Sequence, residues 1–430
     1  MTHAKVILTL GDSLMKHMKT RTKILITASI IAVIIIIQII AANVGQGMVM
    51  RFEETGFIQP YNFDASPSFF GTDDNEVFFA TRDGMRYINI SRPDASWAHT
   101  FSLPRPVMVG RGNMVAVGDQ SGGRRVYVFN REGYMFHQDF DHPILTFSIN
   151  ETGILAVVLQ YSTGHGIYVL SQQSVIERPD GNPWAYRRAE MEELIYPIAV
   201  EVSPDGRHII TAMLDIRVRP TTILQFGHVF QADALDTGRT DGIFSEERLD
   251  GQLVYGMQFM SDNRLIVATT SQIVAYRITP RVQTFSMQEE IWSIPLLNNL
   301  THLEFYGNSH VVYVLGDRLI GDPDALPAGT VHIRNAAGTL TGTFTLGRRA
   351  THLSVGHGSF IVGADRNFHA VTLTGNHLWE HNVLFDTTRH GSVIFLNNTD
   401  NILVAGLNRA IAYERRRTRA NEFESMWDTP

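Results

Sequence analysis

Residues 199–212 read Ala-Val-Glu-Val-Ser-Pro-Asp-Gly-Arg-His-Ile-Ile-Thr-Ala, which is the pattern of two strands joined by a tight turn. Pro204 presets the backbone of the first central turn residue, and Gly206 accepts a positive φ. The β-branched and apolar residues on both sides favour paired strands. This hairpin is the clearest copy of a unit that recurs along the chain.

The recurring unit is an apolar residue followed by a turn and a second apolar strand. Eight copies lie 38 to 57 residues apart, at Phe70, Val109, Phe147, Val202, Phe259, Phe305, Val355 and Phe395. A four-stranded propeller blade needs roughly 40–50 residues. No sustained helical period interrupts the series. We therefore predict an all-β fold, a β-propeller of four-stranded blades over residues 61–417, with eight blades and seven as the alternative.

The two ends of the propeller region suggest how the ring closes. The eighth unit runs out after its third strand, at Ala410–Tyr413. An N-terminal strand can complete the last blade, and residues 55–61 are the available piece. Residues 45–60 are therefore predicted to be a linker and a candidate ring-closing strand, and residues 418–430 a C-terminal tail.

The run from Ile24 to Val44 contains no charged residue and is long enough to cross the roughly 30 Å core of a bilayer. Basic residues dominate the 23 positions before it, which predicts a cytoplasmic N-terminus. We predict that residues 1–23 form a short cytoplasmic tail, that residues 24–44 form a transmembrane signal anchor, and that the propeller is extracytoplasmic at the cell membrane. The alternative is a signal peptide cleaved near Ala42, although the apolar core of such peptides is only about 7–15 residues long.

Composition excludes several classes of function. The formal net charge of −7 gives no basic field for binding the nucleic-acid backbone, so no nucleic-acid partner is expected. The chain has no cysteine, which rules out thiolate metal sites, disulfides and a catalytic cysteine. Neither a Walker loop nor a Gly-x-Ser-x-Gly elbow occurs in the sequence.

Two turn motifs carry a resemblance to known propeller families. Val202-Ser203-Pro204-Asp205-Gly206-Arg207 resembles the strand–turn signature of bacterial WD40-like propellers, and Thr374-Gly375-Asn376-His377-Leu378-Trp379 is similar to the turn of quinoprotein-like (PQQ-like) blades. Quinoprotein dehydrogenases of this fold hold pyrroloquinoline quinone with calcium and, commonly, a vicinal cysteine pair. This chain has no cysteine and no matching ligand set, so the resemblance implies a non-enzymatic relative without a cofactor.

One enzyme motif matches as text. His377-Leu378-Trp379-Glu380-His381 fits the His-x-x-Glu-His pattern of zinc peptidases, which requires both histidines on one helical face. The segment follows a glycine turn and is predicted to be a strand, in which a four-residue offset separates side chains by roughly 13 Å. Two ligands at that separation cannot share one zinc ion, so we predict ordinary strand residues.

Polar residues recur just before the apolar column of the first strands. Because side chains alternate along a strand and the first strand is innermost in a propeller, we predict that they line the central channel. The candidate channel-lining residues are Thr146, Glu201, Gln258, His302, Glu304, His352 and Ser354. Glu201, Glu304 and the two histidines could hold a cation or a water cluster. A wet channel wall without a ligand is the alternative, and no metal site is assigned.

Two repeats are longer than the others. The third carries extra residues at 172–193 and the fourth at 231–242, both between the third and fourth strands, so both insertions should emerge on one face. Trp, Tyr and Arg dominate protein interfaces. We therefore predict that Trp184, Tyr186, Arg187 and Arg188 contact a partner. The alternative is an insertion folded back on its own blade with Trp184 buried.

These patterns predict a membrane-anchored β-propeller that acts as a protein-binding or scaffolding module, in envelope assembly or sensing. The alternative is an enzyme, or a propeller that binds a metal or a small ligand, using the central channel. No catalytic residue is assigned, and the sequence favours a non-enzymatic protein. The partner itself is not identified by the sequence.

Overall fold

The computed structural model describes residues 48–60, 68–72, 76–119, 122–162, 164–177, 185–190, 194–228, 243–278, 288–318, 329–383, 393–406 and 408–419. The predicted membrane anchor, residues 24–44, lies outside this part of the chain. Among the residues that are described, no helix is long and apolar enough to cross a membrane. Glu54–Glu414 forms one compact unit, and the other described residues are the first residues of β1 and the last of β32.

The strands group into eight four-stranded antiparallel sheets, so the prediction of eight blades is confirmed. Blade 1 consists of β2 (Ser68–Thr72), β3 (Glu76–Thr81), β4 (Gly84–Asn89) and β5 (Trp97–Thr100). Blade 2 consists of β6 (Pro106–Arg111), β7 (Met114–Asp119), β8 (Arg125–Asn130) and β9 (Gly133–Asp139). Blade 3 consists of β10 (Ile144–Ile149), β11 (Leu155–Tyr161), β12 (Gly164–Leu170) and β13 (Ala185–Glu190). Blade 4 consists of β14 (Ile195–Val202), β15 (His208–Asp215), β16 (Thr221–His228) and β17 (Ile243–Asp250).

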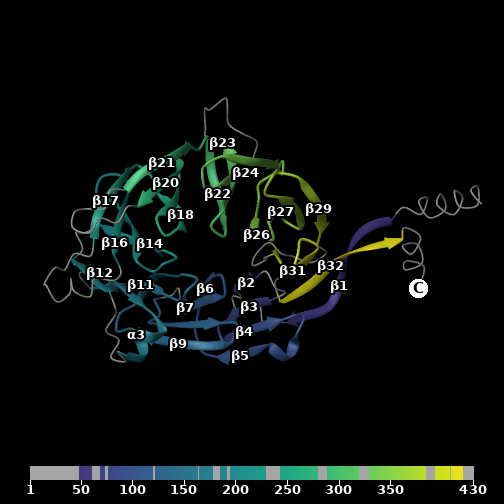
Figure 1. The fold of residues 1–430 in the computed structure, drawn as a ribbon, viewed down its shortest axis with the longest axis horizontal. Coiled ribbons are helices and arrows are strands. Elements are labelled where there is room, and N and C mark those ends of the chain that lie inside the picture. The colour runs from purple at the N-terminus through teal and green to yellow at the C-terminus, as the bar shows by residue number, and fades with distance from the viewer. Residues whose placement is uncertain are drawn as a thin grey trace, which may run out of the picture. The chain divides into compact units, whose positions relative to one another are not determined.

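The second half of the ring repeats this order (Figure 1). Blade 5 consists of β18 (Val254–Ser261), β19 (Arg264–Thr269), β20 (Gln272–Ile278) and β21 (Gln288–Pro295). Blade 6 consists of β22 (Asn298–Tyr306), β23 (His310–Arg318), β24 (Thr330–Asn335) and β25 (Leu340–Thr345). Blade 7 consists of β26 (His352–Gly356), β27 (Ser359–Ala364), β28 (Asn367–Thr372) and β29 (His377–Asn382). Blade 8 consists of β30 (Val393–Phe395), β31 (Asn401–Ala405), β32 (Arg409–Arg419) and β1 (Met48–Pro60).

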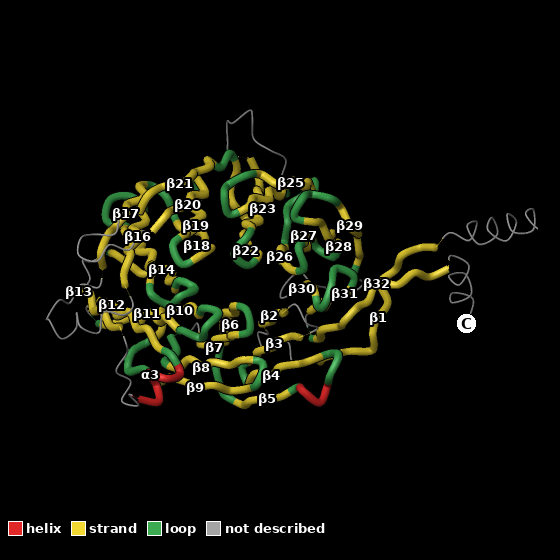
Figure 2. The backbone as a smooth tube through the Cα atoms, in the orientation of Figure 1, coloured by secondary structure: helices red, strands yellow, loops and turns green. Residues whose placement is uncertain are grey.

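The first strands contact one another in sequence order around the centre, and β30 contacts β2, so the blades form a closed ring. In the eighth blade β1 is the fourth strand, next to β32. Figure 2 shows a ring of strands joined by loops, with little helix. The two helical segments described are short, η2 (Pro93–Ala95) and α3 (Gln172–Glu177).

The hydrophobic core lies between neighbouring blades. Ala116 and Val126 of blade 2 pack with Phe147 and Val157 of blade 3, for example, and similar layers join the other blades. The second strands are therefore covered on both faces, which explains why Ser359–Ala364 is buried along its whole length instead of alternating. The apolar runs of the sequence correspond to these buried strands.

The hairpin at residues 199–212 has the predicted form. β14 pairs with β15 from Ile195↔Asp215 to Val202↔Ile209. The Gly206 amide donates to the Ser203 carbonyl at 2.9 Å, and Gly206 has a φ of 71°. A Cβ on Gly206 would lie 2.1 Å from Ile154 of blade 3, so glycine also permits the two blades to approach.

Candidate functional site

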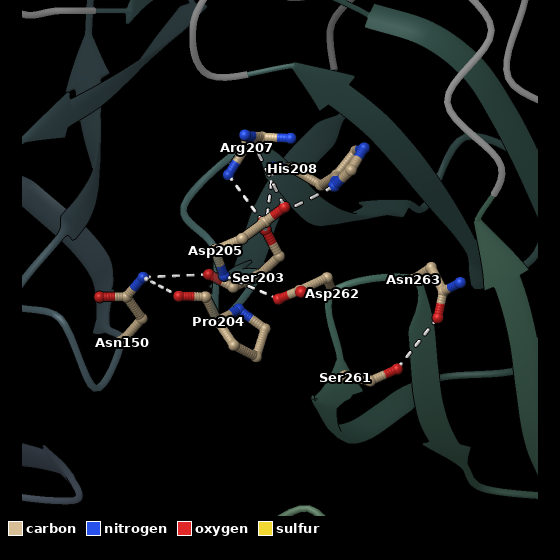
Figure 3. A network of polar contacts seen from close by, with 9 residues as sticks. All are labelled: Asn150, Ser203, Pro204, Asp205, Arg207, His208, Ser261, Asp262 and Asn263. Carbon is tan, nitrogen blue, oxygen red and sulfur yellow. Dashed lines mark hydrogen bonds and ion pairs between the residues drawn. The ribbon is translucent and has the colours of Figure 1, made fainter.

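The turns between first and second strands gather at one end of the ring, which we call the upper face. Asn150 Nδ2 of blade 3 donates to the Ser203 carbonyl of blade 4 at 3.0 Å (Figure 3). The Asp205 amide of blade 4 donates to Asp262 Oδ1 of blade 5 at 2.9 Å. The opposite end, where first strands begin and second strands turn into third strands, is the lower face.

A cavity of about 590 Å³ lies at the centre of the ring. Its wall includes four of the predicted channel residues, Gln258, Glu304, His352 and Ser354. Thr146, Glu201 and His302 are not among the residues that line this cavity. Thr146 pairs with Val158 of its own blade and is half-buried. The volume falls within the range of small-molecule sites, about 300–1,000 Å³.

Several of these polar side chains join blades. Gln258 Nε2 donates to the Gly307 carbonyl of the next blade at 2.8 Å. Ser354 Oγ donates to the Val393 carbonyl at 2.6 Å. The oxygen of that carbonyl also lies 2.7 Å from His352 Nε2. We predicted that these polar residues of the first strands face the channel, and the structure shows that some of them also bind the neighbouring blade. Both faces of a blade pack against neighbours, so Gln258 and Ser354 also satisfy backbone groups of the adjacent blade.

Glu201 pairs with Arg111, which comes from blade 2. Arg111 Nη2 lies 3.5 Å from Glu201 Oε2, and the two side chains are 25% and 17% exposed. Burial raises the pKa of Glu201 to about 7, against the lowering effect of Arg111. Arg111 was not among the residues predicted to line the channel. The turn at Gly110–Asn113 gave no signal beyond its glycines.

Glu304 has no hydrogen bond or ion pair to any residue in the described part of the chain. Burial raises its pKa to about 7, and Arg111 partly opposes that shift. Glu304 in turn contributes, after burial, to raising the pKa of Tyr255. Glu304 is thus a carboxyl group in the cavity wall whose charge is not matched by a direct partner.

The two candidate histidines remain neutral near pH 7. Burial lowers the pKa of His352 to about 4, and burial is also the main cause of the lowered pKa of His302. His302 Nδ1 lies 3.3 Å from Thr301 Oγ1. Within the described ranges, no three His, Asp or Glu side chains come together as a metal site would require. The described residues therefore offer no cluster of ligands that would support a metal cation in the channel.

Three of the four predicted partner-binding residues lie in a strand. Trp184 is outside the described residues, as is the insertion at 231–242. Tyr186, Arg187 and Arg188 belong to β13, the fourth strand of blade 3, where they pair with Tyr168, Ile167 and Gly166. The prediction that Tyr186, Arg187 and Arg188 form part of an insertion is wrong, because their segment is the outer strand of blade 3 and pairs with β12. Their role in binding a partner stays a prediction.

An exposed apolar patch lies instead on the lower face. Among described residues, thirteen large hydrophobic side chains are exposed, and eight of them sit at the lower ends of blades 3–6. The lower-face patch consists of Leu145, Leu194, Tyr196, Ile216, Val218, Leu253, Tyr255 and Leu297. Val218 is 96% exposed. Sequence reasoning missed this patch, although apolar residues in the turn Ile216-Arg-Val-Arg-Pro220 were the available signal.

The His377–His381 segment is part of the strand β29, as predicted. Glu380 accepts a hydrogen bond from Asn367 Nδ2 at 2.6 Å, and His377 Nε2 lies 3.3 Å from His369 Nδ1 of the adjacent strand. The helical geometry that the peptidase motif requires is therefore contradicted.

The fold and its central cavity define an eight-bladed β-propeller. Among solved structures, the chain is similar to the C-terminal WD40 domain of Sif2, with 12% identity over 86% of this chain and 99% of that chain and a TM-score of 0.53. The Dos1 propeller is similar at 9% identity over 83% and 95%, with a TM-score of 0.50. BamB from Moraxella catarrhalis matches at 13% identity over 85% and 98%, with a TM-score of 0.46. At these identities the likeness shows the fold alone.

A family model matches residues 69–405, nearly the whole propeller. The chain therefore belongs to the family of unknown function DUF5711. No curated protein matches the chain.

Proposed function

We propose that this protein is a membrane-anchored, extracytoplasmic propeller that binds a protein partner through the lower-face patch. The carrying observation is the concentration of exposed apolar side chains at the lower ends of four consecutive blades. Exposed apolar side chains that concentrate on one face in this way are typical of interaction sites. Tyr196 and Tyr255 add the large, amphipathic rings that are frequent at the centres of interfaces.

The charges around the patch favour a protein over a lipid surface. Arg217 and Arg248 both pair with Asp215, at 2.7 and 3.1 Å, and Arg219 pairs with Asp250 at 3.2 Å. The hydrogen bond from Arg217 is the main reason that the pKa of Asp215 is lowered, so this carboxylate stays ionised. Arginines that are already paired offer little attraction to anionic headgroups, whereas a partner protein can cover mixed charges and apolar side chains together.

The sequence supports the anchored part of the proposal. The uncharged run Ile24–Val44, with basic residues on its N-terminal side, predicts a single-pass protein with a cytoplasmic N-terminus. A role in envelope assembly or sensing follows from this placement. Residues 374–379 resemble the turn of PQQ-like blades, and we propose that this protein is a non-enzymatic relative of those propellers.

Site-specific photo-crosslinking in host membranes tests the proposal. The full-length protein would carry the crosslinking amino acid at position 218 on the lower face or at position 340 on the upper face, where Leu340 is also exposed. We expect one protein partner to be captured from position 218 and not from position 340. The double substitution Val218→Asp and Leu253→Asp should lower recovery about tenfold or more, since each buried apolar side chain contributes about 1.5–3 kcal/mol.

Leu340→Asp is the matched control, because it places the same charge at an exposed apolar position on the opposite face. It should leave recovery unchanged, and thermal unfolding of all variants should agree within a few degrees. Equal capture from both faces, or capture of lipid alone from position 218, would contradict the proposal.

A further inference from the structure

The central cavity has an aromatic wall. Phe69 and Phe70 of blade 1, Phe305 and Tyr306 of blade 6, and Phe395 of blade 8 all line it. Aromatic faces carry partial negative charge, and they attract organic cations that lie within about 6 Å of the ring. The cavity is therefore suited to a ligand with an apolar body and a positive charge.

Most polar groups in the cavity wall already have partners within the protein. Gln258 donates to the Gly307 carbonyl, and Ser354 donates to the Val393 carbonyl. Arg111 pairs with Glu201, and Arg131 Nε lies 2.7 Å from Glu76. Each arginine in the wall is thus matched by one carboxylate.

Glu304 is the carboxyl group left over from this pairing. No hydrogen bond or ion pair joins it to another described residue, and its side chain is half-buried in the cavity wall. Glu151, which is exposed and also lines the cavity, adds a second negative charge. The charge balance of the cavity is therefore negative, and one bound monovalent cation would neutralise Glu304.

We propose that this cavity binds a small organic monocation, an ammonium ion on an apolar or aromatic body, with Glu304 as its counter-ion and the phenyl rings around the body. The site is separate from the lower-face patch and does not depend on it. A carboxylate supplies hydrogen-bond acceptors for the ammonium group, and the rings exclude water from the rest of the ligand.

Binding should depend on pH, because only ionised Glu304 attracts a cation. Burial raises the pKa of Glu304 to about 7, so ionisation rises between pH 6 and pH 8. The charged and titratable groups that line the cavity or lie next to Glu304 are Arg111, Arg131, Glu151, Glu201, Tyr255, Tyr306 and His352. Over this range Tyr255 stays neutral because its pKa is raised, and His352 stays neutral because its pKa is about 4. Glu201 also has a pKa of about 7, and its charge is matched by Arg111.

Calorimetric titration of the full-length protein in lipid nanodiscs tests the proposal, with empty nanodiscs subtracted. The probes are phenethylammonium, its neutral isostere 2-phenylethanol and the anion 3-phenylpropanoate. At pH 8 we expect saturable binding of phenethylammonium, at least tenfold tighter than either other probe. The affinity should fall about tenfold from pH 8 to pH 6, since the ionised fraction of Glu304 falls from about nine tenths to about one tenth.

Glu304→Gln should weaken phenethylammonium binding at least tenfold and remove most of its pH dependence. Glu132→Gln, at an exposed turn on the upper face, is the matched control and should change neither. If Glu304→Gln fails to fold, the comparison of the three probes and the pH series on the unaltered protein decides the question. Absence of saturable binding at pH 8, equal affinity for all three probes, or affinity independent of pH would overturn the proposal.

Discussion

Asn150 shapes its own turn and joins two blades with one buried side chain. Its Oδ1 accepts from the amides of Thr152 and Ile154 at 3.0 and 2.9 Å, which holds the turn after β10. Its Nδ2 donates to the carbonyls of Ser203 and Pro204 at 3.0 and 3.3 Å (Figure 3). The side chain that shapes the turn of blade 3 thereby also holds that turn against the turn of blade 4.

Asn150→Ala should lower the free energy of unfolding by about 3 kcal/mol, because several hydrogen bonds are lost and buried carbonyls are left unsatisfied. Asn335→Ala is the comparison, since Asn335 Oδ1 accepts from the Ala337 and Thr339 amides, both at 3.0 Å, within its own blade only. Its cost should be about 1–2 kcal/mol smaller. Urea unfolding of both variants measures the difference, and equal costs would show that the inter-blade donation contributes nothing.

Single residues of the candidate site were only partly predictable. Gln258, Glu304 and Ser354 follow from strand periodicity, because the pleat repeats every two residues. Arg111 does not, since it is 90 positions from Glu201 and meets it only across the ring. Glu304 lacks a direct partner among the described residues because the arginines of the cavity wall pair with other carboxylates. Those pairings join distant parts of the chain, so no local sequence pattern predicts them.

The fourth strands of three blades are tied to the next blade by tryptophan. The indole Nε1 groups of Trp97, Trp292 and Trp379 donate to the carbonyls of Arg131, Ala336 and Thr399 at 2.9, 3.3 and 2.7 Å. Trp292 also lies against the glycine of the next turn. A Cβ on Gly338, which has a φ of 84°, would lie 2.7 Å from the Trp292 ring.

Gly338→Ala should therefore destabilise the protein by about 3 kcal/mol, of which about 1 kcal/mol is backbone strain and the rest displacement of Trp292. Gly347→Ala provides the control, because Gly347 has a φ of 76° but open space where the added methyl group would lie. It should cost only about 1 kcal/mol, the strain of the left-handed backbone alone. Chemical denaturation monitored by tryptophan fluorescence measures both, and a similar loss for the two variants would refute a role for the Trp292 contact.

The ring as a whole is closed by strands from opposite ends of the chain. Thr55 Oγ1 of β1 donates to the Ala412 carbonyl of β32 at 3.2 Å, and Tyr413 donates to Glu54 Oε1 at 3.4 Å. Phe57 packs against the apolar layer that contains Val77 and Leu403, between blades 8 and 1. Blade 8 therefore depends on β1 for its outer edge and for part of its core.

A chain that begins at residue 48 should fold, whereas one that begins at residue 61 should melt about 5 °C lower or more and aggregate. The shorter chain loses the burial of Phe57 and exposes the edge of β32, and an unpaired edge pairs readily with other chains. Differential scanning calorimetry and light scattering measure these outcomes. Identical melting temperatures and monodisperse behaviour would show that β1 is dispensable for closure.

The strand-turn-strand unit, its repetition and the number of blades could all be predicted from the amino-acid sequence. These features are local, because turn residues and the alternation of side chains act over a few positions. The folded ring was needed to show that residues 185–190 form a strand, that Arg111 meets Glu201, and that apolar side chains from four blades share the lower face. Each of these three features depends on how the chain and its blades are arranged in the ring. The ring brings together residues that are far apart in the sequence, whereas strand periodicity relates only residues within one strand.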